Sequence, residues 1–218
     1  MFKMNNCSYA CLVIVCLAAS QCPADMAGVE VDSGVTVWRL FSGADTVVGW
    51  RFTTNTDITV TSLGLFDWGS DGFAGTYDLG LFASNGTTLA TASIGPGTSA
   101  SIVGGFQYAD ISPLSLMGGQ TYAVAFYSSA SDAPKCLAPT LSEFEANSAI
   151  NWIGTYVEYS TGSLQYPTRL FTDSDDVYPG TFGANFRFME ANVVPLPGAV
   201  FLGFLGLGAA GMKLRQFV

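Results

Sequence analysis

The chain has 218 residues, of which 8 are Lys or Arg and 17 are Asp or Glu, so its net charge is −9. Such an acidic surface repels a phosphate backbone, which excludes nucleic acid as a partner. The chain contains no histidine, and this excludes Ser-His-Asp and Cys-His catalysis as well as histidine-based zinc sites.

The first 27 residues are typical of a secretory signal peptide. Lys3 precedes a short apolar stretch, residues 11–20, and small residues follow that stretch. The stretch is too short to cross a bilayer as a helix, which needs about 20 residues. The alternative interpretation is a buried N-terminal helix. We expect cleavage near residues 20–24 or after residue 27, and an exported folded domain from residue 28 to residue 192.

The cysteines argue against a protein held together by disulfides. Four of the five cysteines lie in or beside the predicted signal peptide, and Cys136 alone is certain to remain in the mature chain. A disulfide framework is therefore excluded. Cleavage after Ser20 would leave Cys22 in place as well, so a bridge between Cys22 and Cys136 stays open.

Alternating apolar residues predict β-strands throughout the domain. Val48, Trp50 and Phe52 share one face of a segment, and residues 182–188 repeat the pattern with three phenylalanines. Because side chains in a strand point to opposite faces in turn, this alternation indicates half-buried strands. Further strands are expected at residues 77–83, 88–94, 106–111, 122–127, 150–159 and 164–169.

The segments between these strands indicate the fold class. The apolar face changes sides between Val60 and Leu63, which predicts a bulge or bend near Thr61 and Ser62. Glycine-rich turns are expected at residues 69–72, 85–86, 95–97, 104–105 and 118–119. Short strands joined by such turns predict an all-β fold, a β-sandwich or jelly roll. A helix at residues 141–149, with a capping box, is the one local alternative.

The turn at residues 67–72 is the best candidate for a site. Asp67, Asp71 and the nearby Asp78 could supply oxygen ligands to Ca²⁺, a hard cation. The alternative is that the aspartates cap the turn by accepting hydrogen bonds from backbone amides. Trp68 lies in this turn rather than in a strand, and an aromatic ring there could stack on a sugar. Trp38 and Trp152, in contrast, occupy positions expected to pack in the core.

The C-terminal tail, residues 193–218, predicts a membrane anchor. Residues 199–212 are almost wholly apolar and would form a helix about 21 Å long. The basic residues Lys213 and Arg215 then mark a cytoplasmic end. The alternative is a buried C-terminal helix of the globular domain. The apolar run follows an extended, proline-containing motif formed by Val194, Pro195, Leu196 and Pro197.

This tail resembles the PEP-CTERM protein-sorting signal, in which a Pro-x-Pro motif precedes an apolar helix and a basic end. Leu196 stands where the family usually has glutamate, and the basic end here is short. The resemblance implies cutting by an exosortase-type enzyme and delivery to the cell surface or to extracellular polymer. The segments 63–67, 71–73, 78–82, 119–122 and 183–186 resemble uncharacterised PEP-CTERM ectodomains, which implies a β-sandwich of unknown function.

These observations favour an exported, non-catalytic structural or interaction protein of the cell surface or exopolysaccharide matrix. The membrane, an exosortase-type enzyme and extracellular polysaccharide are its expected partners, and no cofactor other than Ca²⁺ is expected. The alternative is a carbohydrate- or calcium-dependent binding module. An enzyme is not expected, because Glu143, Glu145 and Glu158 stand in no recognisable catalytic motif.

Overall fold

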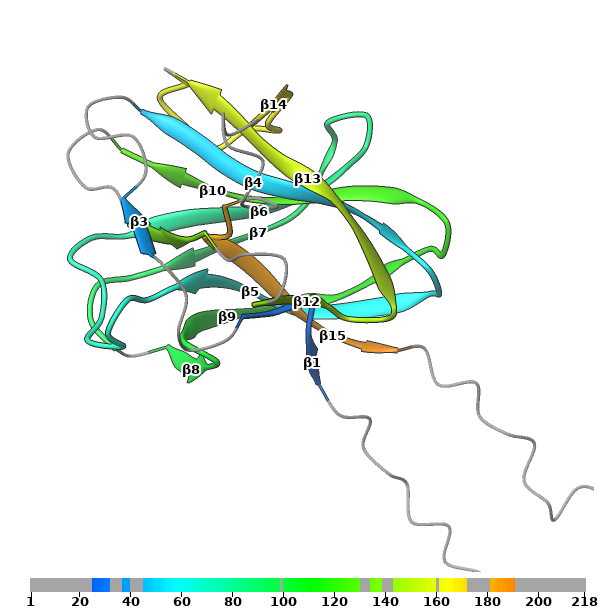
Figure 1. Cartoon of the computed structure of the whole chain (residues 1–218), viewed down its shortest axis with the longest axis horizontal. Coiled ribbons are helices and arrows are strands. Elements are labelled where there is room, and N and C mark those ends of the chain that lie inside the picture. Colours follow the sequence, from blue (N-terminus) through cyan, green and yellow to red (C-terminus); the bar gives the residue numbers. More distant parts are fainter. Residues whose placement is uncertain are drawn as a thin grey trace, which may run out of the picture.

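The structure is a computed structural model that describes residues 25–31, 37–39, 45–98, 100–129, 134–138, 143–159, 161–171 and 181–190. Two antiparallel sheets pack on either side of one apolar core (Figure 1). This architecture confirms the predicted all-β sandwich. In the described part of the chain, no helix is long and apolar enough to cross a membrane. The predicted tail, residues 193–218, and residues 1–24 of the predicted signal peptide lie outside the described residues.

Two larger sheets and two short ribbons hold the strands. The five-stranded sheet has the order β1 (Met26–Ala27), β15 (Ala184–Glu190), β5 (Ile58–Phe66), β9 (Phe106–Leu116) and β8 (Ser101–Val103). The six-stranded sheet has the order β14 (Arg169–Leu170), β13 (Ile150–Tyr159), β4 (Thr46–Thr54), β10 (Thr121–Ser128), β6 (Tyr77–Ala83) and β7 (Thr88–Ile94). The ribbons pair β11 (Lys135–Leu137) with β3 (Val37–Arg39), and β12 (Phe144–Ala146) with β2 (Val29–Val31).

Aromatic rings join the two sheets at the centre of the core. Phe186 of β15 stacks on Trp50 and Phe52 of β4, with ring centroids 5.6 and 4.7 Å apart. The buried indole Nε1 of Trp50 donates a hydrogen bond of 2.7 Å to the Ala184 carbonyl. Burying each such side chain contributes about 1.5–3 kcal/mol to stability. The alternation seen in the sequence therefore identifies the core-facing residues of both strands.

The predicted irregularity near Thr61 and Ser62 is a β-bulge in β5. Against β15, the consecutive residues Arg187 and Phe188 pair with Ser62 and Val60, which leaves Thr61 as the extra residue. Its side-chain hydroxyl donates a 2.8 Å hydrogen bond to the Asp25 carboxylate. The bulge thus changes the face of the strand, as predicted, and also holds the start of the described chain.

The strand predicted at residues 164–169 is wrong for most of its length. Only Arg169 and Leu170 form a strand, β14. Leu164 and Tyr166 instead pack on the outer face of the six-stranded sheet, where the Tyr166 ring lies 6.0 Å from the Phe82 ring. The alternating apolar residues of this segment therefore cover the outer face of a sheet. Every second side chain points toward that sheet, so the sequence shows the same period of two as a strand.

The helix considered for residues 141–149 is not formed by its described part. Phe144–Ala146 is the strand β12, which pairs antiparallel with Val29–Val31. Asn147 then turns the chain, because its side-chain oxygen accepts a hydrogen bond from the Ala149 amide. The segment has no apolar helical face, so backbone pairing with β2 decides its conformation.

The folded domain starts earlier than the expected boundary at residue 28. Met26 and Ala27 pair with Phe188 and Arg187 of β15. The Asp25 carboxylate also forms an ion pair with Arg187 at 3.1 Å. The predicted signal peptide, residues 1–27, includes these three residues if cleavage follows residue 27. Their contacts place them in the five-stranded sheet.

The two ends of the described domain lie at the same pole of the sandwich. Met26 pairs with Phe188, close to Glu190, the last residue of β15, and Glu190 itself pairs with Ile58 (Figure 1). Strand β5 then runs about 27 Å from Ile58 to Phe66, at the opposite pole.

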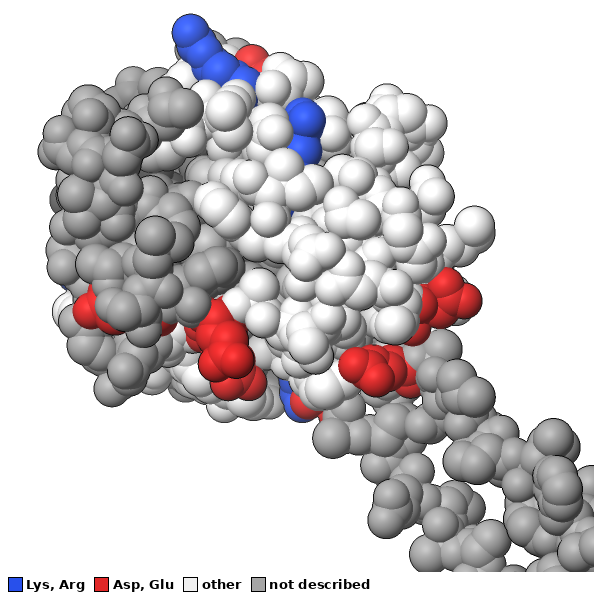
Figure 2. All heavy atoms as spheres, turned by 45° about the vertical axis from the view of Figure 1, so that its right-hand side comes forward, with Lys and Arg blue, Asp and Glu red and all other residues white. Residues whose placement is uncertain are grey.

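Figure 2 shows a largely uncharged face with acidic side chains in its lower half and basic side chains at its upper edge.

Candidate functional site

The turn between β5 and β6 is held in shape by a buried carboxylate. Asp67 directly follows β5 and is only 3% exposed. Its Oδ2 atom accepts hydrogen bonds from the Gly72 amide at 3.0 Å and from Gln107 Nε2 at 2.9 Å. Gln107 also donates to the Gly97 carbonyl at 3.0 Å. The carboxylate therefore joins the turn to β9 and to the neighbouring turn at Gly97.

The backbone of this turn needs glycine where the chain comes closest to its neighbour. Gly72 has a φ of +97°, and a Cβ atom there would lie 2.5 Å from the Gly97 carbonyl carbon. The Gly97 amide donates a 2.9 Å hydrogen bond to the Phe73 carbonyl. A side chain at position 72 would break this contact. The close approach of Gly72 to Gly97 fixes the conformation of the turn, and the side chain of Trp68 projects from this turn into solvent.

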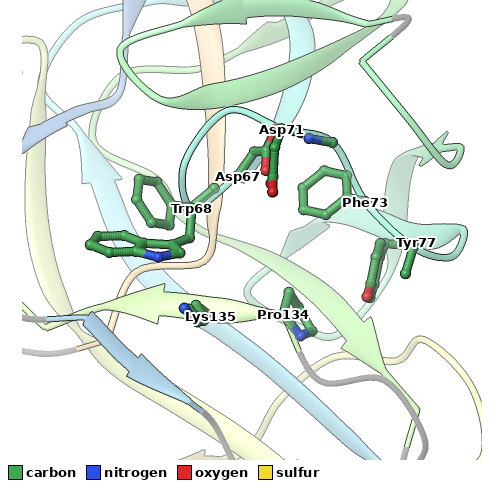
Figure 3. Close-up of a pocket in the computed structure, with 10 residues that line it drawn as sticks. Asp67, Trp68, Asp71, Phe73, Tyr77, Pro134 and Lys135 are labelled. Atoms are coloured by element: carbon green, nitrogen blue, oxygen red, sulfur yellow. Dashed lines mark hydrogen bonds between the residues drawn. The ribbon is translucent and has the colours of Figure 1, made fainter.

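The turn forms one wall of a hollow of about 240 Å³ (Figure 3). The other wall comes from Pro134 and Lys135, at the start of the short strand β11. Two kinds of side chain line the hollow: the aromatic residues Phe66, Trp68, Phe73 and Tyr77, and the charged residues Asp67, Asp71 and Lys135. A concave surface with aromatic walls and a few polar groups is the usual form of a small-ligand site.

Trp68 is the exposed aromatic ring of the hollow, whereas the aromatic residues opposite it are more deeply buried. Trp68 is 49% exposed. Tyr77 is buried, and its ring meets the edge of the Phe73 ring with centroids 5.0 Å apart. Trp68 therefore offers an indole face to a ligand, and Phe73 and Tyr77 form a fixed apolar wall opposite it (Figure 3).

Lys135 brings a positive charge to the hollow. Its Nζ atom lies 4.9 Å from the centroid of the Trp68 ring, within the range of a cation–π contact. The next residue, Cys136, is fully buried, and burial raises the pKa of its thiol. Leu137 exchanges backbone hydrogen bonds of 2.8 and 2.7 Å with Phe182. Strand β11 is thus fixed to the core, and the lysine points away from it.

The structure brings two of the three candidate calcium ligands to the hollow. Asp67 and Asp71 line it, but Asp78 lies on β6, where its Oδ1 accepts a 2.6 Å hydrogen bond from Ser93. Among the described residues, no three Asp, Glu, Cys or His side chains are grouped closely enough to hold a metal ion. Asp67 caps the turn through the Gly72 amide, as the alternative interpretation expects. Calcium binding stays a prediction.

Sequence analysis identified Trp68 and its turn but missed Lys135, Phe73 and Tyr77 as parts of the same hollow. Trp68 and Lys135 meet because β11 packs beside the end of β5, through the Leu137–Phe182 bridge. Trp152 packs against the core, as expected. Of Trp38 the structure describes the backbone alone, which pairs with Cys136 in β11. The sorting-motif residues 194–197 and the basic residues Lys213 and Arg215 lie outside the described residues.

A second hollow, of about 220 Å³, has a different chemistry. It is lined by Glu30, Glu145, Asn147 and Ser148, and Glu30 faces Glu145 across the β2–β12 pair. These side chains supply oxygen and amide groups, whereas the first hollow adds aromatic rings and a cation. The first hollow therefore has more of the features of a ligand site.

Comparison with known proteins identifies a family for most of the chain. A family model described as a domain of unknown function, DUF4082, matches residues 37–178. No curated protein matches the chain. Two solved structures show remote similarity. One is a family 35 carbohydrate binding module from an environmental isolate, with 10% identity and a TM-score of 0.32 over 62% of this chain and 94% of that chain. The other is Xyl-CBM35 in complex with a glucuronic acid containing disaccharide, with 12% identity and a TM-score of 0.30 over 65% and 95%.

Proposed function

The chain belongs to the DUF4082 family of domains of unknown function, and we propose that it is an exported, envelope-anchored module that binds extracellular carbohydrate without catalysis. One observation carries this proposal. The half-exposed Trp68 stands over a hollow whose walls hold aromatic rings, a carboxylate and an ammonium group. The lining of the hollow, more than the fold, supports the binding of a ligand.

The lining suits a sugar ring in three ways. The C–H face of a pyranose packs against an indole, and Trp68 exposes one. Ring hydroxyls need hydrogen-bond acceptors and donors, which Asp71 and Lys135 supply at the rim. Both charged side chains are exposed, so a ligand reaches them without opening the core. A sugar therefore finds an apolar contact and polar partners in one place.

The proposed address comes from the tail and agrees with the shape of the domain. The tail resembles a PEP-CTERM signal, which supports membrane insertion of the predicted C-terminal helix and processing by an exosortase-type enzyme. Glu190 ends the described chain at the pole opposite the hollow. A molecule tethered through its C-terminal tail would present Trp68 away from the membrane, toward extracellular polysaccharide.

A glycan array probed with the full-length chain in mild detergent tests the proposed function. We expect saturable binding to one class of saccharide, weakened at least about tenfold in Trp68→Ala, because a central Trp commonly dominates binding energy. Met117→Ala is the matched control, since Met117 is 65% exposed and follows β9 at the other pole. Its binding should equal that of the wild type.

The same array separates the alternatives. Binding lost in EDTA and restored by Ca²⁺ would support the calcium-dependent form of the module, with Asp67 and Asp71 as ligands. Silence toward every glycan, or equal binding by Trp68→Ala and the wild type, would contradict the proposed site. Silence would leave a structural role in the matrix as the better interpretation.

A further inference from the structure

The hollow places opposite charges on either side of an aromatic face. In Figure 3, Lys135 and Asp71 lie on opposite sides of the hollow, with Trp68 between them at one edge. The ammonium group of Lys135 lies over the indole, 4.9 Å from the ring centroid. In the free protein, therefore, the cation covers part of the surface on which a ligand ring would stack.

The position of this cation is set by the fold. Lys135 lies between Pro134 and Cys136, both buried. Strand β11 is paired with β3 on one side and bridged to Phe182 beside it. The backbone of Lys135 is therefore fixed, and only its flexible side chain moves. An ammonium group on a fixed backbone beside an exposed indole is part of a built site.

Lys135 contacts an aromatic ring, whereas the guanidinium groups of Arg187 and Arg51 are bound to a carboxylate and to a carbonyl. Arg187 is paired with Asp25 at 3.1 Å. Arg51 donates a 2.8 Å hydrogen bond to the Pro167 carbonyl and stacks on Tyr156. No described carboxylate forms an ion pair with Lys135. Because the chain as a whole is acidic, an anion is attracted only where such a cation acts at short range.

A ligand that stacks on this face of Trp68 has to displace the ammonium group. A neutral sugar would lose the cation–π contact and would bring no charged group to replace it. A sugar with a carboxylate exchanges that contact for a charge-assisted hydrogen bond, which is the stronger interaction. The exchange frees the indole face and pairs the lysine in the same step.

We propose that the ligand of the hollow is an acidic saccharide, a pyranose that carries a single carboxylate per ring, as in a uronic acid. Its carboxylate pairs with Lys135, its C–H face stacks on Trp68, and a ring hydroxyl donates to Asp71. Ligands with several charges per residue, such as highly sulfated polymers, are repelled by Asp71 and by the acidic domain. This inference rests on the proposed function and adds the ligand class.

Matched oligosaccharides test the proposal directly. The full-length chain is titrated with oligogalacturonate and oligoglucuronate, and with the methyl ester of each, which keeps the ring and removes the charge. We expect each acid to bind about fivefold more tightly than its ester at low salt. The preference should shrink in 0.5 M NaCl, where the Debye length is only a few ångströms.

Three variants assign any preference to its source. Lys135→Gln should bind acid and ester equally, whereas Lys135→Arg should keep most of the preference. Arg169→Gln, the control, removes an exposed cation from β14 on the other sheet and should behave like the wild type. Because Lys135 is exposed, circular dichroism should show an unchanged fold in Lys135→Gln.

The outcomes distinguish the proposed acidic ligand from the more general proposal that the hollow binds carbohydrate. Equal binding of acid and ester by the wild type, with binding lost in Trp68→Ala, would overturn the acidic ligand and leave carbohydrate binding intact. A preference for the acid that survives Lys135→Gln would also overturn it. Binding of none of the four oligosaccharides, together with a silent glycan array, would overturn both proposals.

Discussion

At the scale of single residues, Asp67 determines where Trp68 stands. Its buried carboxylate accepts hydrogen bonds from the Gly72 amide within the turn and from Gln107 on β9. Replacing it with alanine would leave both donors without this acceptor. Leaving a buried donor unpaired costs about 1–3 kcal/mol. The position of Trp68 thus depends on a residue that need not touch the ligand.

We therefore predict that Asp67→Ala lowers the free energy of unfolding by about 1–3 kcal/mol and weakens saccharide binding. Urea denaturation followed by circular dichroism measures the first effect, and titration measures the second. Asp71→Ala is the control for stability, because Asp71 is exposed in the same turn and should change the denaturation midpoint little. An unchanged midpoint in Asp67→Ala would show that the turn does not need the carboxylate.

Cys136 gives a prediction about pH. Burial raises the pKa of its thiol above the ordinary value of 9.0. In the unfolded chain the thiol ionises near pH 9, while the folded chain keeps its proton. The unfolded state then binds fewer protons, so stability falls as the pH rises above about 9. Below that pH both states are protonated, and the thiol contributes no pH dependence.

The measurement compares the wild type with Cys136→Ala between pH 7 and pH 10.5. Above pH 9 the free energy of unfolding should fall more steeply with pH in the wild type. The difference in slope should correspond to the release of at most one additional proton on unfolding. Tyr108, whose pKa burial also raises, is common to both proteins and cancels in the comparison. Parallel curves would mean that the thiol ionises equally in both states. The thiol is free in the structure, so it should react with a thiol reagent once unfolded.

At the scale of elements, the first strand bears on where the predicted signal peptide would be removed. Asp25 contacts both Arg187 and Thr61, and β1 adds two residues to the edge of the five-stranded sheet. Cleavage after Ser20 or Ala24 keeps these contacts, whereas cleavage after Ala27 removes them. The fold therefore favours the two earlier sites among the three that the sequence left open.

We predict that the mature N-terminus, read by mass spectrometry of the exported protein, lies at or before Asp25. A chain that begins at Gly28 should be less stable than one that begins at Asp25, by about 1–2 kcal/mol. The ion pair contributes only a small part of this difference, because both side chains are partly exposed. Equal melting temperatures, or an observed N-terminus at Gly28, would contradict the role of β1.

Period-two alternation predicted the long strands well. The expected ranges 77–83, 88–94 and 150–159 are the observed bounds of β6, β7 and β13. Strands of two or three residues, such as β1 and β11, are too short to show a period. The segment around Tyr166 alternates but lies over a sheet instead of within one, because Arg51 and Phe82 offer its ring a surface to pack on. The alternation of apolar residues shows which side chains are buried, but tertiary contacts decide whether the segment pairs as a strand or packs on a sheet.

The site was predictable from sequence only in part, for a physical reason. A tryptophan in a glycine-rich turn is visible as an exception to alternation, and so are the aspartates beside it. Lys135 carries no such signal, because an isolated exposed lysine is ordinary. Its place at the hollow follows from the pairing of β11 with β3 and from the bridge between Leu137 and Phe182. Long-range topology, which one sequence does not reveal, completed the site.

At the scale of the whole molecule, the proposed tether and the proposed binding hollow lie at opposite poles of the domain. Strand β5 connects them, with Ile58 near the exit of the chain and Phe66 at the hollow. The domain can therefore be held at one pole without covering the other. The proposed tail processing then decides whether the domain stays on the membrane or passes to the surface polymer.

The last prediction concerns this processing. The Pro195–Leu196–Pro197 segment is the predicted recognition motif of a sorting enzyme, and its prolines disfavour a helix. Replacing Pro195 and Pro197 with alanine should leave a longer, membrane-bound protein, detected by mass spectrometry of cell fractions. Lys135→Gln, which alters the distant hollow, should be processed normally. An unchanged mass and location in the double variant would reject cutting at this motif. Saccharide binding by the double variant should equal that of the wild type, because β15 separates the tail from the hollow.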